Sequence, residues 1–222
     1  MRTILPRLLS APTPESLQQS SLLIISLLKL YILLGSTIHS VIAPLIPSLI
    51  LPILNLVLGQ NRFPSTALVS ILYAYLYYIP IMAVNGVTES FVASVATTSD
   101  LAKQSRAMVF CSVAFLGTAW ALLRMAEMGG EGLVWANCVN MGFRILWSCN
   151  FIRAWYSSKG VKVDWSLALP ARGTMIATVV IGLVIRLVCG KAGLTSFIPT
   201  VGLAGIGGLT LVGCMYSPFF QN

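Results

Sequence analysis

The sequence predicts an all-α protein, a polytopic transmembrane helix bundle of about six spans. Hydrophobic residues make up 57% of the chain and charged residues 9%, far below the roughly 25% charged residues of soluble domains. Apolar runs of about 20 residues recur along the chain, and this is the length that a helix needs to cross a bilayer. A chain of 222 residues has room for about six such helices with short connections. The composition therefore predicts one membrane domain and no separate soluble module.

A polar segment is expected first, over residues 1–20, because it carries charges and several prolines and lacks an apolar core. We interpret it as a cytosolic N-terminal tail. The first span is predicted over about 21–43, where a long apolar run reaches Pro44. The second is predicted over about 65–96. Pro80 lies inside it and predicts a kink, because proline removes a backbone donor and clashes with the preceding turn.

Two further spans are predicted over about 107–123 and 133–152, joined by the glycine-rich turn Met128–Gly132 into an antiparallel hairpin. The longest polar connection, residues 153–170, contains lysines and aromatic residues, which is typical of a loop at the membrane interface. Two last spans close the chain. The six predicted spans fill one bundle over residues 21–222: about 21–43, 65–96, 107–123, 133–152, 171–189 and 197–215.

The distribution of basic residues predicts the orientation, because loops on the cytosolic side are enriched in lysine and arginine. One set of alternate connections, including the tail, carries most of them: Arg2, Arg7, Lys103, Arg106, Arg153, Lys159, Lys162 and Arg172. The opposite connections carry Arg62, Arg124 and Lys191. We therefore expect a multi-pass protein with both termini in the cytosol. The net charge of +8 is then a signal of topology and of contact with lipid headgroups, and no nucleic-acid partner is predicted.

Several function classes are excluded by what the sequence lacks. The five cysteines lie in apolar segments without a close-spaced pair, so we interpret them as small reduced residues rather than as disulfides or zinc ligands. No combination of Ser, His and Asp, no Cys and His pair, and no phosphate-binding glycine loop is recognisable. His39 is the one histidine, and a lone histidine is more often a hydrogen-bonded polar group than a proton relay. The sequence therefore predicts neither an enzyme nor a cofactor.

Polar side chains inside the predicted spans are the candidate functional residues, because such groups are costly in hydrocarbon. The candidate substrate-binding residues are Lys29, Asn85, Glu89, Asn137, Asn140 and Arg144. Asn85 and Glu89 are four residues apart and share a helix face, as do Asn140 and Arg144. With alternating helix directions, Lys29, Glu89 and Arg144 all fall in the cytosolic half of the bilayer, roughly 10–15 Å deep. We expect them to converge there.

Two interpretations of these residues remain open. In the functional one, Lys29 and Arg144 receive a phosphate-bearing lipid headgroup, and Glu89 keeps the empty site near neutrality. In the structural one, the charges form a buried salt bridge or extend toward the interface, and they only fix the register of the helices. Spacing alone favours neither interpretation for Lys29 and Arg144, and it favours the structural role for Glu89.

Four segments of the chain resemble one family. They are SLLKLYILLG at Ser26–Gly35, NGVTESF at Asn85–Phe91, AKQSRAMVF at Ala102–Phe110 and GLVWANCVNMGFRILWSCNFI at Gly132–Ile152. They resemble the C-terminal half of the Rft-type oligosaccharide-translocation proteins of the endoplasmic reticulum, and fungal members in particular. The resemblance covers about Ser20–Ser157 and weakens toward the C-terminus.

This resemblance implies the fold of the multidrug/oligosaccharidyl-lipid/polysaccharide exporter superfamily, in which two helical bundles surround a central cavity. The chain would correspond to the C-terminal bundle. The implied function is movement of dolichol-diphosphate-linked oligosaccharide from the cytosolic to the luminal leaflet for N-glycosylation. Membrane lipid and the missing N-terminal bundle, or a partner subunit, are the other expected partners. The alternatives are a non-transporting membrane partner of the N-glycosylation machinery and a drug or ion exporter of the same superfamily.

Overall fold

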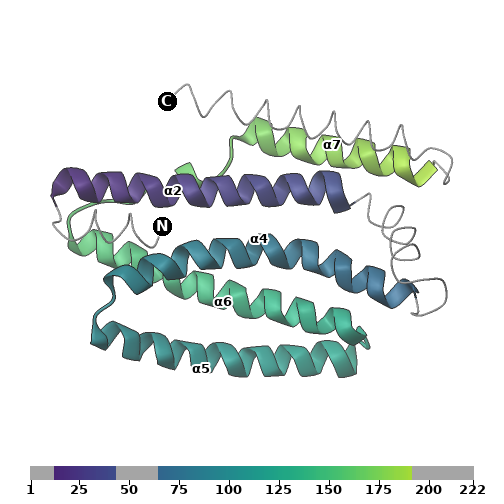
Figure 1. Ribbon diagram of the computed structural model, residues 1–222, viewed down its shortest axis with the longest axis horizontal. Helices are drawn as coiled ribbons and strands as arrows, with labels where there is room; N and C mark the ends of the chain where they lie inside the picture. The colour runs from purple at the N-terminus through teal and green to yellow at the C-terminus, as the bar shows by residue number, and fades with distance from the viewer. Residues whose placement is uncertain (1–12, 44–64, 192–222) are drawn as a thin grey trace. The chain divides into compact units, whose positions relative to one another are not determined.

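A computed structural model describes residues 13–43 and 65–191, and every element in these two ranges is a helix (Figure 1). The elements are α2 (Pro14–Thr37), η1 (Ile38–Ile42), α4 (Ser65–Val95), α5 (Thr98–Trp120), η3 (Ala121–Met125), α6 (Gly129–Ser158), η4 (Trp165–Ala168) and α7 (Arg172–Lys191). The described residues contain no strand. The predicted all-α class is therefore confirmed.

Four helical segments of the described residues are long and apolar enough to cross a membrane. They are Pro14–Ile42, Ala67–Val95, Thr98–Met125 and Trp165–Ile185. Helix α6 has 30 residues, enough to span hydrocarbon at 1.5 Å per residue, but Asn137, Asn140 and Arg144 make it less apolar than the other four. The polytopic membrane fold is confirmed. The sixth predicted span, 197–215, lies outside the described residues.

The chain divides into two compact units. The first unit comprises Met1–Ile32 and Tyr78–Leu169, and the second comprises Leu33–Tyr77 and Pro170–Asn222. Within the first unit, α5 and α6 form the predicted antiparallel hairpin (Figure 1). The rings of Phe110 and Phe143 meet edge to face across this hairpin, with their centroids 5.9 Å apart.

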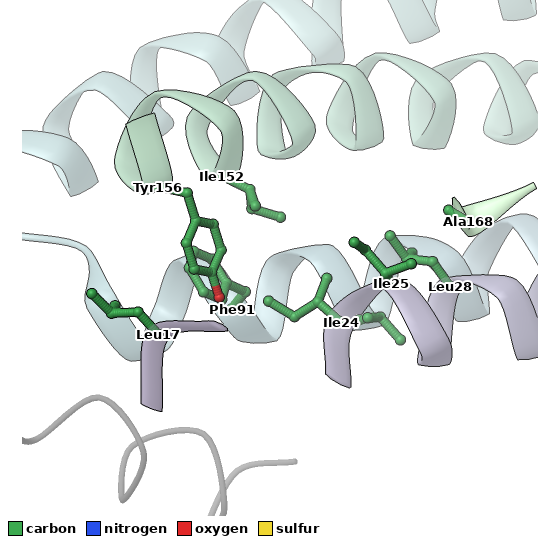
Figure 2. Packing of buried hydrophobic residues seen from close by; sticks show 9 residues of the cluster. Leu17, Ile24, Ile25, Leu28, Phe91, Ile152, Tyr156 and Ala168 are labelled. Carbon is green, nitrogen blue, oxygen red and sulfur yellow. The ribbon is translucent and has the colours of Figure 1, made fainter. Parts of the chain in front are cut away.

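Nine buried side chains from α2, α4, α6 and η4 form the core of the first unit (Figure 2). The largest is Tyr156, whose ring stacks on Phe91 with the centroids 5.4 Å apart. The cluster consists of Leu17, Ile24, Ile25, Leu28, Val87, Phe91, Ile152, Tyr156 and Ala168. In lipid, apolar burial alone does not drive helices together, so close packing and buried hydrogen bonds must stabilise this contact.

Helix α2 begins at Pro14, before the predicted start at Ser21. Proline suits the first position of a helix because the backbone N–H that it lacks would have no partner there. The hydroxyl of Thr13 accepts a hydrogen bond from the Ser16 backbone N–H at 3.2 Å and so caps this end. Part of the expected polar tail is therefore helical, and its Leu17 is buried in the core.

The start of α5 also differs from the expected one. The helix begins at Thr98 rather than at Ala107, because Thr97 and Asp100 form a reciprocal capping box. Lys103 and Arg106 consequently lie on the first turns of a helix and not in a loop. They remain at the same end of the hairpin as the end of α6, because α5 and α6 run antiparallel.

Helix α6 extends beyond the predicted end at Ile152 as far as Ser158. Trp155 and Tyr156 therefore belong to a helix rather than to an interfacial loop, and Tyr156 is fully buried. The shorter connection that follows contains η4. There the hydroxyl and the backbone N–H of Ser166 donate to Asp164 Oδ1, and both hydrogen bonds lower the pKa of the Asp164 carboxyl.

Candidate functional site

An ion pair joins α4 and α6 in the first unit. The Nε and Nη2 atoms of Arg144 donate to the same oxygen, Oε1 of Glu89, at 2.8 and 2.6 Å. The side chain of Arg144 is 29% exposed and that of Glu89 24% exposed, so both charges are largely withdrawn from the surroundings. The sequence motifs that contain these two residues are thus brought into direct contact.

The geometry of this pair leaves hydrogen-bonding capacity unused. A guanidinium group has five N–H donors, and Glu89 receives two of them. The usual bidentate arrangement places parallel bonds on two oxygens of one carboxylate or phosphate. Here both bonds converge on Oε1. Within the described residues, the second oxygen of Glu89 and the remaining donors of Arg144 make no further hydrogen bond, so they can bind another polar group.

Asn85 lies one turn before Glu89 on α4 and is only 5% exposed. Its side-chain Oδ1 is buried, and the described residues supply no hydrogen-bond partner for it. The backbone carbonyl of Asn85 is not available in the same way, since the Thr88 hydroxyl donates to it at 3.0 Å. A buried carbonyl oxygen without a donor is costly, so this position favours a bound water or a polar ligand.

Ser148 is a buried polar residue that the sequence did not single out as a site residue. It lies one turn after Arg144 on α6, is fully buried, and its Oγ has no partner in the part of the chain that the structure describes. Most helical hydroxyls here donate to the preceding turn, as those of Ser90 and Thr178 do. The i+4 spacing to Arg144 was the available signal.

The other predicted site residues occupy the same unit. Asn137 and Asn140 lie on α6, two turns and one turn before Arg144, and both are half-buried. Lys29 lies on α2, is also half-buried, and adjoins Leu28 of the core. Of the expected contacts among the site residues, the structure shows that between Glu89 and Arg144. The grouping of Lys29 and the two asparagines around this pair stays a prediction.

This arrangement suits recognition of an anion better than binding of a metal. Arginine binds phosphate through its planar fork, and a neighbouring carboxylate balances its charge when no ligand is present. Within residues 13–43 and 65–191, no group of three or more His, Cys, Asp or Glu side chains is placed to hold a metal ion. The Glu89–Arg144 pair is the part of the candidate site that the structure shows directly.

Comparison with known proteins places the chain in a family. The family model described as "Rft protein" matches residues 1–217. Among curated proteins, the chain is 43% identical over 116 residues to the Man(5)GlcNAc(2)-PP-dolichol translocation protein RFT1 of Yarrowia lipolytica, covering 52% of this chain and 17% of that protein. No solved structure matches.

Two further proteins of the same name match over longer segments. The Eremothecium gossypii protein is 32% identical over 152 residues, 68% of this chain and 27% of that protein. The Saccharomyces cerevisiae protein is 33% identical over 156 residues, 70% of this chain and 26% of that protein. The matched segments thus span about a quarter or less of the length of these relatives. The family model covers nearly the whole chain, and the chain belongs to the Rft protein family.

Proposed function

We propose that this chain takes part in moving dolichol-diphosphate-linked oligosaccharide from the cytosolic to the luminal leaflet of the endoplasmic-reticulum membrane, for protein N-glycosylation. Family membership supports the proposal, since the relatives are named as translocation proteins for Man(5)GlcNAc(2)-PP-dolichol. The Glu89–Arg144 pair is the observation that carries it. A cation that is costly to place among apolar helices fits the diphosphate group that all such lipids share.

The proposed mechanism is an exchange of anions on Arg144. In the empty state, Glu89 accepts the hydrogen bonds of the guanidinium group. A diphosphate would replace the carboxylate, because its several charged oxygens can accept parallel hydrogen bonds from the same fork. Lys29 is proposed to supply a second positive charge, and the amides of Asn85, Asn137 and Asn140 to bind hydroxyl or acetamido groups of the sugar.

The proposed orientation places both termini in the cytosol. The cations at one end of the first unit support it: Lys103 and Arg106 on the first turns of α5, Arg153 near the end of α6, and Lys159 and Lys162 after it. All five are exposed. Anionic lipids attract such a cluster on the cytosolic leaflet.

A second bundle is part of the proposal. The segments matched by the relatives cover 17–27% of their length, so the rest of the cavity wall is assigned to another bundle of the same protein or to a partner subunit. Helix α5 and the turn η3 that follows it offer a face for such contact, because together they expose one row of large apolar side chains: Val109, Val113, Leu116, Trp120 and Leu123. Their spacing of three or four residues is that of a helix-packing stripe.

The alternative function is that of a non-transporting membrane partner that supports the N-glycosylation machinery. The direct ion pair between Glu89 and Arg144 favours this alternative, because the arginine already has an anionic partner within the protein. In that case the Glu89–Arg144 pair would fix the register of α4 and α6, and its charges would not meet a ligand. No catalytic role is proposed in either case.

Reconstituted translocation distinguishes the two functions. The chain is inserted into liposomes that contain a dolichol-diphosphate-linked oligosaccharide, with and without the additional bundle of a full-length relative. Faster transfer between leaflets in the complete assembly, lost on Arg144→Gln, is the expected result. Transfer at the rate of empty liposomes in every assembly would overturn the proposed function and leave the alternative.

A further inference from the structure

The second unit contains a chain of three polar rings that the proposed site does not use. His39 Nε2 lies 3.3 Å from the hydroxyl of Tyr77, and this hydroxyl lies 3.3 Å from that of Tyr73. The imidazole and the Tyr77 ring are in contact, with their centroids 4.5 Å apart. The two tyrosine rings meet edge to face at 5.5 Å. An ionisable imidazole is costly to place within an apolar helical segment, so residues of this kind are usually functional.

The backbone around His39 is also unusual. Residues Ile38–Ile42 form a single π-helical turn, in which the Ala43 N–H donates to the Ile38 carbonyl. Single π turns are rare and are frequently found at functional sites. Helix α7 packs directly against this turn, since a Cβ atom on Gly182 would lie 3.4 Å from Ser40. The backbone next to His39 is thus closely packed against α7.

Protonation of the imidazole would reverse the direction of these hydrogen bonds. When Nδ1 carries the proton of a neutral ring, Nε2 accepts from Tyr77, and Tyr77 accepts from Tyr73. When the ring is charged, both nitrogens are donors, so Tyr77 must accept from Nε2–H and its own proton turns to Tyr73. A proton arriving at the Tyr73 oxygen can reach the imidazole by two O–H transfers, which leave both tyrosines neutral and one added charge on His39.

The described titratable side chains of the second unit are mostly uncharged. Helix α4 contributes Tyr75 in addition to the two bonded tyrosines, and η1 contributes no titratable side chain besides His39. On α7, the described side chains include one charge, Arg172, which precedes Gly182 by about 15 Å of helix. The described residues of the second unit include no carboxylate. When His39 takes up a proton, the described residues of this unit therefore offer no acidic side chain to compensate the added charge.

We propose that His39, Tyr77 and Tyr73 form a proton-binding site within the membrane part of the protein, with His39 as the group that takes up the proton. The binding of a proton changes which element donates across the contact between η1 and α4. The site is separate from the Glu89–Arg144 pair and does not depend on the translocation function. The sequence suggests that this lone histidine is only a hydrogen-bonded polar group. The structure places it at the end of a row of two tyrosine hydroxyls.

The single histidine makes this proposal directly measurable. The 222-residue chain is labelled with ¹⁵N-histidine, carries no histidine tag, and is placed in lipid nanodiscs, so that one imidazole gives all the signals. The nitrogen shifts are followed from about pH 4.5 to 8.5, a range that brackets an ordinary histidine. We expect one reversible titration. Tyr77→Phe should lower its midpoint by about 0.5–1 pH unit, because a charged imidazolium gains more from a hydrogen bond than the neutral ring does.

Two further variants complete the test. Tyr73→Phe should lower the midpoint by less than Tyr77→Phe, because Tyr73 acts through Tyr77. Tyr31→Phe removes a tyrosine hydroxyl in the first unit and should leave the midpoint unchanged. An imidazole that does not titrate in the unaltered chain would overturn the proposal, and so would a midpoint that Tyr77→Phe leaves in place. The titration of the unaltered chain needs no substitution, so the proposal can be tested even if a variant fails to fold.

Discussion

Ser20 and Tyr156 meet in the core of the first unit, with Ser20 Oγ and the Tyr156 hydroxyl 2.7 Å apart. Both residues are fully buried. Ser20 also donates to the Leu17 carbonyl at 2.8 Å, so when Ser20 uses its one proton there, Tyr156 is the donor of the bond between the two side chains. This bond joins α2 to α6, where apolar burial in lipid contributes little to helix association.

Removal of the Tyr156 hydroxyl should weaken this contact without emptying the core. Tyr156→Phe keeps the ring that stacks on Phe91 but leaves Ser20 without its partner from α6. We expect a loss of about 1 kcal/mol in the free energy of unfolding, the typical value for one hydrogen bond. Tyr156→Ala should cost about 3–5 kcal/mol, because it also leaves a cavity.

Unfolding in mixed detergent micelles, followed by circular dichroism, measures both changes. Tyr31→Phe is the matched control, since Tyr31 packs against the same core. It should change the stability by less than Tyr156→Phe does. Equal effects of the two Tyr→Phe substitutions would contradict the assignment of a stabilising role to the bond between Ser20 and Tyr156.

The Glu89–Arg144 pair should contribute to stability through mutual coupling. Glu89→Gln or Arg144→Gln alone leaves one charge without its partner, and we expect a cost of about 1–3 kcal/mol for side chains as buried as these. The double substitution should cost less than the sum of the two. A double-mutant cycle of unfolding free energies gives the coupling energy.

An exposed ion pair provides the comparison for this cycle. Lys103 Nζ lies 3.3 Å from Asp100 Oδ1, and the Lys103 side chain is 60% exposed. Lys103→Gln should therefore change the stability by less than about 1 kcal/mol. A coupling energy near zero for Glu89 and Arg144 would show that the pair does not hold α4 and α6 together.

Two glycines of α6 should respond oppositely to the same substitution. A Cβ atom on Gly132 would lie 3.1 Å from Leu122 Cβ and 3.2 Å from Met128 Cβ, and one on Gly142 would meet nothing within 4 Å. Gly132→Ala should destabilise the α5–α6 hairpin by about 1 kcal/mol through crowding. Gly142→Ala should be neutral or stabilising by up to about 1 kcal/mol, because alanine is the better helix former. Thermal unfolding of the two variants decides between these signs.

The proposed orientation can be tested by glycosylation mapping. An Asn-X-Thr acceptor placed beside Glu127, in the turn between η3 and α6, should be modified when the chain is inserted into endoplasmic-reticulum membranes. The same acceptor beside Lys159 should remain unmodified, because the positive-inside rule places that connection in the cytosol. Electrophoretic mobility before and after endoglycosidase treatment gives the result. The reverse pattern would invert the topology.

The sequence predicted the helices well, because long apolar runs determine which segments can lie in lipid. It predicted their ends less well. The capping box at Thr97 and Asp100 is a local polar pattern that marks the start of α5. From sequence alone, the basic residues Lys103 and Arg106 in this segment suggest a loop. Likewise, Ser148, Ile152 and Tyr156 repeat at four-residue spacing, a helical pattern that extends α6 past the predicted end.

Helical spacing also made part of the candidate site predictable. The i+4 pairs placed Glu89 and Arg144 on defined helix faces, and the opposite charges favoured their contact. Sequence alone could not show that Ser148 Oγ and Asn85 Oδ1 find no hydrogen-bond partner among the described residues, because hydrogen-bond satisfaction depends on the packing of neighbouring helices. Nor could it show the contact between His39 and Tyr77, whose positions lie on two different helices.

Binding of a dolichol-diphosphate-linked oligosaccharide to the nanodisc-embedded chain shows whether the diphosphate and Glu89 compete for Arg144. If the diphosphate competes with Glu89 for Arg144, Arg144→Gln should weaken binding by about tenfold or more, and Glu89→Gln should strengthen it, because the competing carboxylate is gone. Unfolding measured on the same samples shows that each variant is folded. Unchanged affinity in both folded variants, or an equal loss in both, would overturn the competition between the diphosphate and Glu89 and assign the pair a purely structural role.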